Sequence, residues 1–319
     1  MRDAITGSTG LVGSEVVTVL SAAGHEVIRL VRRAPAPGEK GVLRWDPVKR
    51  EVDAAGLEGL DAVVHLAGEN IASGRWNAAR KAAIRDSRVN GTRLLCEALA
   101  GLARPPKTLV CASAIGIYGD RGEDALTEES PAAAGFLPEV CREWEAASEP
   151  AARKGIRVVV LRIGVVLSPK GGALSRMLPL FRAGLGGVIG NGRQYVSWVA
   201  LDDLVGIILH ALQSGELCGP VNAVAPVPVT NRELTEALGK VLSRPTLFPV
   251  PAFALRLAVG EMADALLLSS TRVVPRRLEE TGYPFRFPEL GAALRHLLGK
   301  GVEGDIPGST PEGKECPPP

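Results

Sequence analysis

Few of the residues that mark a disulfide-stabilised, metal-binding or aromatic-rich protein occur in this chain. Its five cysteines in 319 residues stand at 96, 111, 141, 218 and 316, and no two have a Cys-x-x-Cys spacing. This spacing argues against a disulfide framework and a zinc site, and predicts free thiols. Only 4% of residues are aromatic and the four histidines are scattered, so we expect no metal centre.

An excess of one charge is also missing. The 37 basic and 35 acidic residues give a net charge of +2, and no basic stripe interleaved with aromatic residues occurs, so we expect no nucleic-acid partner. No apolar run reaches the roughly 18 residues that a membrane span needs. The N-terminus shows no pattern of a signal peptide. We therefore expect a cytoplasmic protein without a membrane partner, as a monomer or homodimer.

What the chain does have is a regular alternation of apolar strands and helices. A strand, a glycine-rich turn, a helix ended by Gly24 and a second strand fill the first 31 residues. Strands are expected over 4–6, 25–31, 61–66, 108–112, 157–167 and 221–224, and helices over 14–23, 77–100, 139–154 and 201–213. This alternation predicts an α/β protein with a Rossmann-type, doubly wound parallel sheet.

The second half of the chain has a different sequence pattern, with glycine-rich stretches and short predicted helices. A capping box, Thr230 to Glu233, opens a helix that should end near 242. We predict a Rossmann domain that binds NADP over residues 1–168, with 197–224 returning to it. A smaller α/β C-terminal domain, mostly on the substrate side, should occupy 169–299, and 300–319 should be a disordered tail. A ligand cleft is expected between the two domains.

The first strand runs directly into the glycine-rich turn Gly7-Ser8-Thr9-Gly10-Leu11-Val12-Gly13. One glycine permits the tight turn, another lets backbone N–H groups approach a pyrophosphate, and the third lets the helix pack on the strand. The start of the helix adds partial positive charge. We therefore predict a dinucleotide site that includes Gly7, Thr9, Gly10, Leu11, Val12 and Gly13; a glycine turn without a ligand is the alternative.

The end of the second strand indicates which dinucleotide binds. NAD enzymes place Asp or Glu there to bond the ribose 2′-OH, whereas this chain has Arg32 and Arg33, and its next acidic residue is Glu39. A 2′-phosphate suits the guanidinium group. The predicted cofactor is therefore NADP(H), with Arg32 at the 2′-phosphate; two solvated arginines are the alternative.

A third strand ends in small residues, where backbone can pass close to a dinucleotide. This stretch is Val63-Val64-His65-Leu66-Ala67-Gly68, and His65 is expected to be packed rather than catalytic. We predict that Leu66, Ala67 and Gly68 line the cofactor.

Together the motifs resemble those of the extended short-chain dehydrogenases/reductases, and more closely their atypical, sugar-nucleotide epimerase-like group. The resemblance covers about residues 1–298. Further matching stretches are Asn90-Gly91-Thr92, Ile117-Tyr118-Gly119, Trp144-Glu145, Arg162–Leu167, Gln194–Trp198 and Pro275-Arg276-Arg277. It implies NADP(H) at the strand ends, with Arg88 facing it and Val166 near the nicotinamide. It also implies an oxidoreductase or epimerase-like activity on a small polar or nucleotide-linked substrate.

The chain departs from this family in two places. Asp3 stands where members usually carry an apolar residue, which should shorten the first strand. The Tyr-x-x-x-Lys pair of hydride-transferring members is missing, because Gly122, Val199 and Phe287 follow the three tyrosines at 118, 195 and 283. With Trp144-Glu145 as the anchor, Leu137 and Cys141 fall at the tyrosine and lysine positions, and Ala114 falls near that of the usual Ser or Thr.

Other residues must therefore supply any catalysis. Ser113 and Tyr118 follow a strand at its ligand-binding end and are the candidate catalytic residues; a packed aromatic is the alternative for Tyr118. Cys141 is expected to be a buried filler. Candidate substrate contacts are Glu69, Arg193, Tyr195 and Trp198, the last three of which either clamp an anionic substrate or pack between domains. Asp202 and Asp203 are expected to cap a helix.

Two functions remain open from these residues. The first is an NADP(H)-dependent, epimerase-like oxidoreductase, which the cleft residues 193–198 favour. The second is a sensor or regulator that binds NADP(H) without turnover, which the missing Tyr-x-x-x-Lys pair favours.

Overall fold

The computed structural model describes residues 1–300. The predicted tail, apart from Lys300, therefore lies outside the described residues, as does Cys316. A central sheet has the strand order β12-β8-β6-β5-β1-β2-β3-β4 and is parallel throughout, except that β4 runs antiparallel to β3. Its strands are β1 (Arg2–Thr6), β2 (Glu26–Val31), β3 (Val42–Asp46), β4 (Glu51–Val52), β5 (Ala62–His65), β6 (Thr108–Ala114), β8 (Arg157–Ile163) and β12 (Gly219–Ala223).

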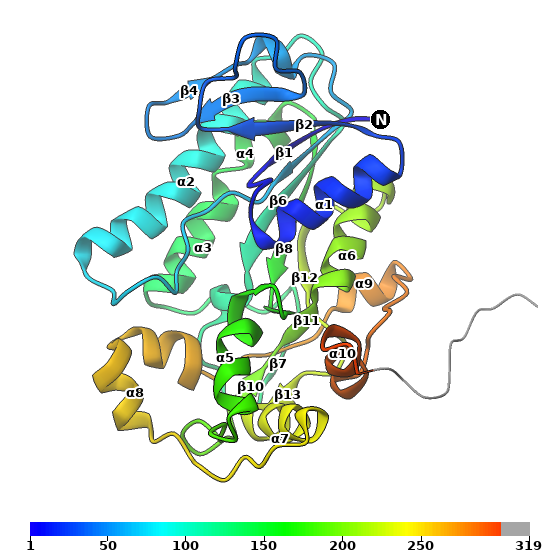
Figure 1. Ribbon diagram of the computed structural model, residues 1–319. Helices are drawn as coiled ribbons and strands as arrows, with labels where there is room; N and C mark the ends of the chain where they lie inside the picture. Colours follow the sequence, from blue (N-terminus) through cyan, green and yellow to red (C-terminus); the bar gives the residue numbers. More distant parts are fainter. Residues whose placement is uncertain (301–319) are drawn as a thin grey trace, which may run out of the picture.

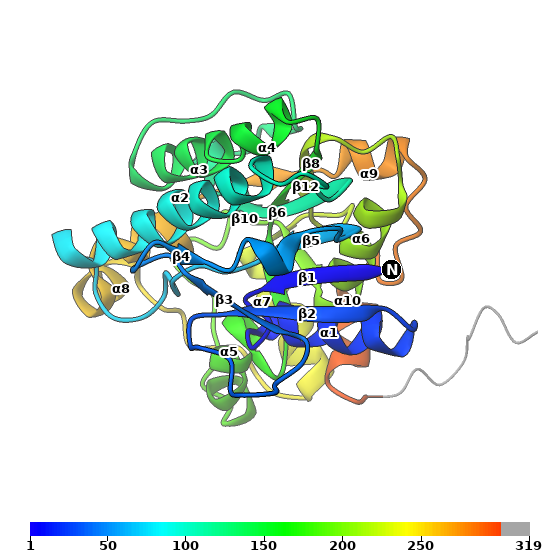
Figure 2. The ribbon, with the colours of Figure 1, turned by 90° about the horizontal axis from the view of Figure 1, so that it is seen from above.

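Helices cover both faces of this sheet, which makes it doubly wound (Figure 2). One face carries α1 (Leu11–Ala22) and α6 (Leu201–Gln213), and the other carries α2 (Ala78–Ala100), α3 (Phe136–Ala146) and α4 (Glu149–Arg153). Each face has its own apolar core: Val16 of α1 and Leu204 of α6 pack on one side, and Leu95 of α2 and Ala151 of α4 on the other. The predicted fold class is confirmed.

The strand order reverses between β1 and β5. From β1 the chain builds β2 and β3 on one side, and then returns to place β5, β6, β8 and β12 on the other. Helices leave the two neighbouring strands in opposite directions at such a point, which opens a crevice beyond their carboxyl ends. The glycine turn after β1 and the small residues after β5 both lie at this crevice.

A smaller unit lies beyond the carboxyl ends of the strands (Figure 1). Its core joins α5 (Gly172–Arg182), α7 (Asn231–Leu242) and α10 (Leu290–Leu297) around Leu178, Leu238 and Leu294. Three short strand pairs stand apart from the central sheet: β9 (Val165–Ser168) with β11 (Trp198–Ala200), β10 (Tyr195–Val196) with β13 (Val229–Thr230), and β7 (Ala125–Leu126) with β14 (Arg272–Val273). The remaining elements are η1 (Ala55–Leu57), η2 (Ile115–Tyr118), α8 (Ala252–Val259), η3 (Asp264–Leu268) and α9 (Arg276–Glu280).

The fold differs from the predicted elements in several places. The helix expected over 139–154 is two helices, α3 and α4. The strand expected over 157–167 breaks at Gly164, where a Cβ would lie 2.6 Å from the Ser197 carbonyl oxygen. This close approach lets β9 leave the large sheet and pair with β11. Strands β3 and β4 were not predicted, because they are only five and two residues long and have no long apolar run.

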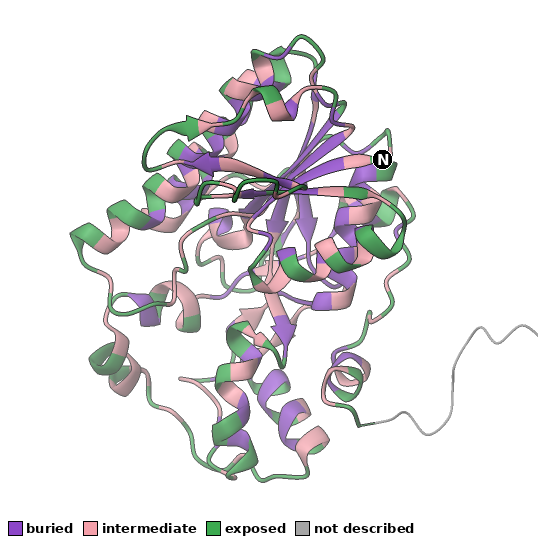
Figure 3. Ribbon diagram, turned by 45° about the horizontal axis from the view of Figure 1, so that its top comes forward, coloured by how far each residue is buried: buried purple, intermediate pink, exposed green. Residues whose placement is uncertain are grey.

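Burial follows the layers (Figure 3), with buried residues along the central strands and exposed ones on the outer sides of the helices. Asp203 is an exception, because it is a charged residue of a helix and yet is buried. It does not cap α6, whose N-cap residue is Ala200; instead its carboxylate accepts hydrogen bonds from the backbone N–H groups of Arg286 (2.8 Å) and Phe287 (2.9 Å). The prediction that Asp203 caps the helix is therefore wrong, and the residue ties the C-terminal segment to α6. No helix within residues 1–300 is long and apolar enough to cross a membrane.

Asp3 does not shorten the first strand, so that prediction is wrong too. β1 begins at Arg2, and Asp3 pairs with Val27 and Ala62 in the sheet. Its carboxylate is fully buried and lies 2.5 Å from Nδ1 of His25, while its second oxygen has no partner in the described part of the chain. The His25 partner is what allows an acidic residue at this apolar position.

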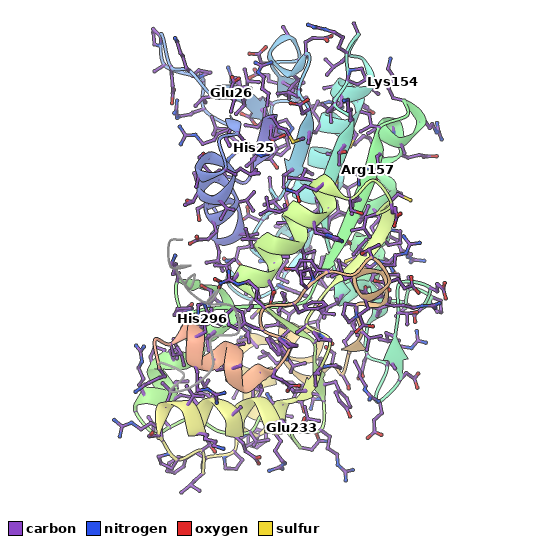
Figure 4. All side chains as sticks on the ribbon, turned by 90° about the vertical axis from the view of Figure 1, so that its right-hand side faces the viewer. His25, Glu26, Lys154, Arg157, Glu233 and His296 are labelled. Carbon is purple, nitrogen blue, oxygen red and sulfur yellow. The ribbon has the colours of Figure 1, made fainter. Side chains whose placement is uncertain are left out.

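We expect His25→Ala to lower the free energy of unfolding by about 2 kcal/mol, because it leaves the Asp3 carboxylate buried without its partner. His25 lies at the end of the molecule away from Glu233 and His296 of the smaller unit (Figure 4). Denaturant unfolding measures the change. The double variant Asp3→Val/His25→Ala is the control and should regain most of the loss; an equal loss in both would contradict the argument.

Candidate functional site

The glycine turn after β1 is built by close backbone approaches. Gly7 has a φ of 67°, and a Cβ there would lie 2.9 Å from the Leu66 carbonyl carbon. A Cβ at Gly13 would lie 2.2 Å from the Gly7 carbonyl oxygen. The Gly10 N–H donates to that same oxygen at 2.9 Å. The turn therefore requires glycine at positions 7 and 13, and it brings the ends of β1 and β5 together.

Polar groups of the turn are left free for a ligand. The N-cap residue of α1 is Gly10, which has no side chain to bond the first N–H groups of the helix. Ser8 is buried, and its hydroxyl has no hydrogen-bond partner among residues 1–300. An open helix start beside an unpaired hydroxyl suits a phosphate group. Ser8 was not among the predicted site residues, although it stands inside the glycine turn; Thr9, which was, is exposed there.

The two arginines after β2 differ in their surroundings. The Arg33 guanidinium forms a two-pronged ion pair with Glu39, at 2.7 and 2.5 Å. Hydrogen bonding from Arg33 lowers the pKa of Glu39 to about 2. Arg32 is exposed and has no ion pair or side-chain hydrogen bond within the described range. Of the two, Arg32 is the guanidinium available to a ligand.

A series of buried hydrogen bonds holds the end of β5 in place. His65 is fully buried between the Thr6 hydroxyl (2.7 Å from Nδ1) and the Thr92 hydroxyl (2.9 Å from Nε2). Burial lowers the pKa of His65 to about 4, so its ring is neutral near pH 7. The Thr6 hydroxyl also accepts from the backbone N–H groups of Leu66 (3.0 Å) and Ala67 (3.2 Å). His65 is packed, as expected, and it fixes the backbone beside the glycine turn.

Arg88 of α2 reaches the residues that follow β5. Its guanidinium donates to the Glu69 carbonyl oxygen at 3.0 Å and lies 5.0 Å from the centre of the Trp144 ring. A Cβ at Gly68 would be 3.4 Å from this guanidinium. Burial lowers the pKa of Arg88. Glu69 itself pairs with Arg80 at 2.8 Å.

Ser113 belongs to a buried polar cluster at the ends of β6, β8 and β12. Its hydroxyl donates to Glu145 at 2.7 Å, and Ser113 is only 3% exposed. Arg162 donates to both oxygens of the same carboxylate, each at 2.9 Å. Ser113 stands opposite Arg162 in the sheet, and Arg162 stands opposite Asn222. The Ser113 proton is thus already donated within the protein.

Tyr118 belongs to the same cluster. It is fully buried; its hydroxyl donates to Asn222 at 2.7 Å and accepts from Arg162 at 2.9 Å. Burial raises the pKa of Tyr118. This geometry favours the packing alternative for Tyr118 over an acid/base role. Arg162, the centre of the cluster, could not be identified from the sequence, since a lone arginine in an apolar strand gives no spacing signal.

Two apolar side chains face the end of β6 where the tyrosine and lysine would be expected. A Cβ at Gly116 would lie 3.6 Å from Cβ of Leu137 and 3.9 Å from Sγ of Cys141. Cys141 is buried, and burial raises its pKa to about 12, so the thiol stays protonated. Neither side chain exchanges protons near pH 7.

The remaining predicted residues lie on the smaller unit and its junction with the sheet. Half-buried Val166 pairs with Val199 between β9 and β11, and a Cβ at Gly171 would be 3.3 Å from the Leu11 side chain. This brings the start of α5 next to the start of α1. Val12 packs on the core beside α6.

Of the predicted substrate contacts beyond β9, only two are accessible. Trp198 is fully buried in the core of the smaller unit and donates to the Val227 carbonyl oxygen at 3.1 Å, which favours packing. Arg193 is exposed. Tyr195 is half-buried, with the Arg272 guanidinium 5.1 Å from its ring centre.

Comparison with known proteins gives matches to nearly the whole chain. Residues 4–223 match the sequence model described as "NAD dependent epimerase/dehydratase family", and residues 250–297 match a "Domain of unknown function (DUF1731)". The chain is 47% identical over 293 residues to Epimerase family protein Mb2239 of Mycobacterium bovis, covering 91% of this chain and 95% of that protein. It is 39% identical over 301 residues to human Epimerase family protein SDR39U1, covering 93% and 100%.

Two solved structures are similar to the fold. The crystal structure of human SDR39U1 (isoform 2) with NADPH has a TM-score of 0.86 at 37% identity, over 94% of this chain and 99% of that one. The nucleoside-diphosphate sugar epimerase from Corynebacterium glutamicum has a TM-score of 0.76 at 41% identity, over 94% of this chain and 58% of that one.

Proposed function

Because the chain belongs to the NAD dependent epimerase/dehydratase family, we propose that it binds NADP(H) at the Gly7–Gly13 turn and uses the nicotinamide in an epimerase-like oxidoreductase reaction. The substrate is a small polar or nucleotide-linked molecule. The observation that carries the choice of NADP(H) is the unpaired Arg32 after β2, beside an Arg33 already engaged by Glu39. A similar protein crystallised with NADPH supports it.

The residues present fit this cofactor. The open start of α1 and the orphaned Ser8 hydroxyl suit the pyrophosphate, and the close backbone approaches at Gly7 and Gly13 hold the turn in the shape that presents them. Arg32 supplies the charge for the 2′-phosphate. Leu66, Ala67 and Gly68 line the cofactor, and Arg88 holds that strand end in place. When bound, the reduced nicotinamide supplies a hydride.

A second function, an NADP(H) sensor without turnover, is favoured by one observation. Leu137 and Cys141 occupy the positions beside Gly116 where a proton-transferring pair would be expected. Ser113 and Tyr118, the candidates named from the sequence, are buried and use their hydroxyl protons inside the protein. Enzyme activity therefore requires a proton donor from another element.

Titration of the purified protein with NADPH and then NADH, by calorimetry, tests the cofactor. NADPH oxidation against a panel of carbonyl compounds, and NADP⁺ reduction against sugar nucleotides, test the reaction. Tight NADPH binding with turnover supports the enzyme. Tight binding without turnover on every compound supports the sensor, and absence of binding by both nucleotides contradicts the proposal.

Arg32→Ala should weaken NADPH binding by roughly ten- to a hundredfold and leave NADH binding nearly unchanged, because a charge-assisted hydrogen bond to the 2′-phosphate contributes about 1.5–3 kcal/mol. The matched control is Arg33→Ala, whose guanidinium is engaged by Glu39 and which should change NADPH affinity much less. Dissociation constants of each variant for both nucleotides, measured by calorimetry, test this expectation. Equal losses for NADPH and NADH would count against the assignment of Arg32.

A further inference from the structure

Most of the exposed large hydrophobic side chains of this protein are gathered on the smaller unit. Ten such side chains are exposed within residues 1–300, and seven of them lie on three segments: Leu180 and Leu185 at the end of α5, Leu247, Phe248, Phe253 and Leu257 before and within α8, and Leu267 of η3. Helices α5, α7 and α8 lie at the end of the molecule away from β3 and β4 (Figure 1). Single exposed apolar residues are normal, whereas a group of this size marks a contact surface.

Hydrogen bonds hold these three segments side by side. The backbone N–H and C=O groups of Val250 bond to the backbone of residues 188–190, at 2.8 and 2.9 Å. The Gln194 side chain donates at 3.1 Å to a carbonyl oxygen of that same stretch and, at the same distance, to that of Leu267. Arg256 of α8 pairs with the first residue of η3 at 2.9 Å. The seven apolar side chains therefore belong to one continuous region, which we call the apolar surface.

Helix α8 is the clearest case of an apolar element that is left uncovered. Seven of its eight residues are apolar, the exception being Arg256, and none of the eight is buried. A helix that is apolar on all sides is normally covered by protein or by lipid. Phe253 and Leu257, one turn apart on the same face, are 72% and 77% exposed. Side chains this exposed stand out from the surface and do not line a groove, because the walls of a groove would cover them.

The charged residues near the apolar surface are mostly of one sign. Residues 172–201 and 237–260 carry six of the seven apolar side chains, and they contain six basic residues and no acidic one. The whole chain has a net charge of only +2, so the rest of it is net acidic. Within the two ranges, Arg182, Lys240 and Arg244 are exposed and form no ion pair with any residue of the described chain.

The acidic residues next along the chain do not neutralise these three cations. Glu261 pairs with Lys81 of α2 at 2.7 Å, and Asp264 pairs with Arg256 at 2.9 Å. Glu236 of α7 is exposed and has no ion pair within the described residues. Three unpaired cations therefore stand beside one unpaired anion, which leaves an excess of positive charge around the apolar surface.

From these uncovered apolar side chains and this excess of positive charge, we propose that the apolar surface binds the anionic face of a lipid bilayer. The apolar side chains enter the boundary between headgroups and acyl chains, and the three unpaired cations contact the headgroup phosphates. A second copy of the chain fits less well, because a symmetric contact would set these cations against their own counterparts.

The lack of a membrane-spanning helix in residues 1–300 concerns the crossing of a bilayer, whereas this proposal concerns a protein that lies on its surface. The expectation of no membrane partner was drawn from the absence of spans and of a signal peptide, and the proposal replaces it. The inference does not rest on the proposed NADP(H) function.

Flotation of the purified protein with two kinds of vesicle tests the proposal. One kind is phosphatidylcholine alone, and the other is an equal mixture of phosphatidylcholine and phosphatidylglycerol. We expect the wild type to float with the mixed vesicles, to float far less with phosphatidylcholine alone, and to be released by added salt, because salt screens exposed charges. Calorimetry with NADPH and thermal unfolding show for each variant that the fold and the nucleotide site are intact.

Two double variants remove the two kinds of contact separately. Phe253→Gln/Leu257→Gln should weaken binding to the mixed vesicles by about tenfold or more, because these side chains no longer gain from leaving water. Arg182→Gln/Arg244→Gln should weaken it by about twenty-fivefold, because each cation near an anionic surface contributes about fivefold. NADPH affinity and Tm should equal those of the wild type in both.

The matched control is Val48→Gln/Lys49→Gln. It removes one exposed apolar and one exposed basic side chain from the turn between β3 and β4, at the opposite end of the molecule, and should bind vesicles as the wild type does. A second readout compares Phe253→Trp with Val48→Trp on mixed vesicles with brominated acyl chains. Bromine should quench most of the emission that the first substitution adds, and little of that added by the second.

Three results would overturn the proposal. The first is a wild type that binds NADPH but does not float with the mixed vesicles. The second is equal vesicle binding by the control and by both double variants. The third is a dimer in sedimentation velocity that Phe253→Gln/Leu257→Gln abolishes, without vesicle binding, because the apolar surface would then be a contact between two copies of the chain. None of these results bears on the nucleotide site, which the NADPH titration tests separately.

Discussion

Replacing Arg162 by methionine is expected to lower the free energy of unfolding by about 3–5 kcal/mol, the usual effect of removing one partner from a buried ion pair. Arg162 donates to both oxygens of Glu145, to the Tyr118 hydroxyl and to the Glu128 carbonyl oxygen. Burial alone would lower the pKa of Arg162, but Glu145 raises it above its ordinary value, so Arg162 stays charged. Denaturant unfolding with an unchanged m-value would measure the loss.

Two further variants separate this explanation from a general effect of mutation in the sheet. The double variant Arg162→Met/Glu145→Gln removes both charges and should recover part of the loss, because no unpaired charge stays buried. Arg153→Met removes the guanidinium of an exposed pair with Glu149 and should cost less than about 1 kcal/mol. A cost for Arg162→Met as small as that of Arg153→Met would show that the cluster does not stabilise the fold.

Gly13→Ala is expected to raise the Kd for NADPH at least about a hundredfold, which corresponds to about 2.7 kcal/mol. The new Cβ would lie 2.2 Å from the Gly7 carbonyl oxygen and 3.1 Å from Cα of Ser8, so the turn or the start of α1 must move. Either movement separates the backbone donors that face the pyrophosphate. Calorimetric titration with NADPH gives the affinity.

The control for this variant is Gly215→Ala. Gly215 lies in a surface loop after α6, and a Cβ there would have no atom within 4 Å. Its NADPH affinity should equal that of the wild type. If Gly13→Ala bound NADPH as tightly as Gly215→Ala, the glycine turn would not be the nucleotide site.

The features that could be predicted from the sequence are those encoded by local pattern. The βαβ opening, the end of its helix at Gly24, which has a positive φ, and the helix from the Thr230 capping box all depend on neighbouring residues, and the structure contains each of them. The break at Gly164 was not predictable in this way, because it depends on Ser197, which reaches it through the fold rather than along the chain. The short β3 and β4 likewise depend on their pairing with β2 and with each other, because they are too short to show a clear pattern.

The polar clusters show more clearly that contacts between distant residues cannot be predicted from local sequence pattern. Asp3 looked like a defect in an apolar strand, because its partner His25 stands 22 residues later, just before β2. Arg162 and Glu145 gave no signal as a pair, since one lies on β8 and the other on α3. Lys81 and Glu261 are 180 residues apart. A buried or bridging charge is stabilised by a partner far away in the chain, so a single sequence shows the charged residues but not which of them pair.

The boundary of the C-terminal match at residue 250 does not coincide with a boundary in packing. Within the matched segment, Val273 pairs with Leu126 of β7, Leu278 and Tyr283 belong to the core beside α6, and Leu294 packs against Leu238 of α7. The segment thus packs against several other parts of the chain and does not form a separate hydrophobic core. It therefore cannot be moved to another protein as an independent module, because most of the apolar partners of its side chains belong to other parts of the chain.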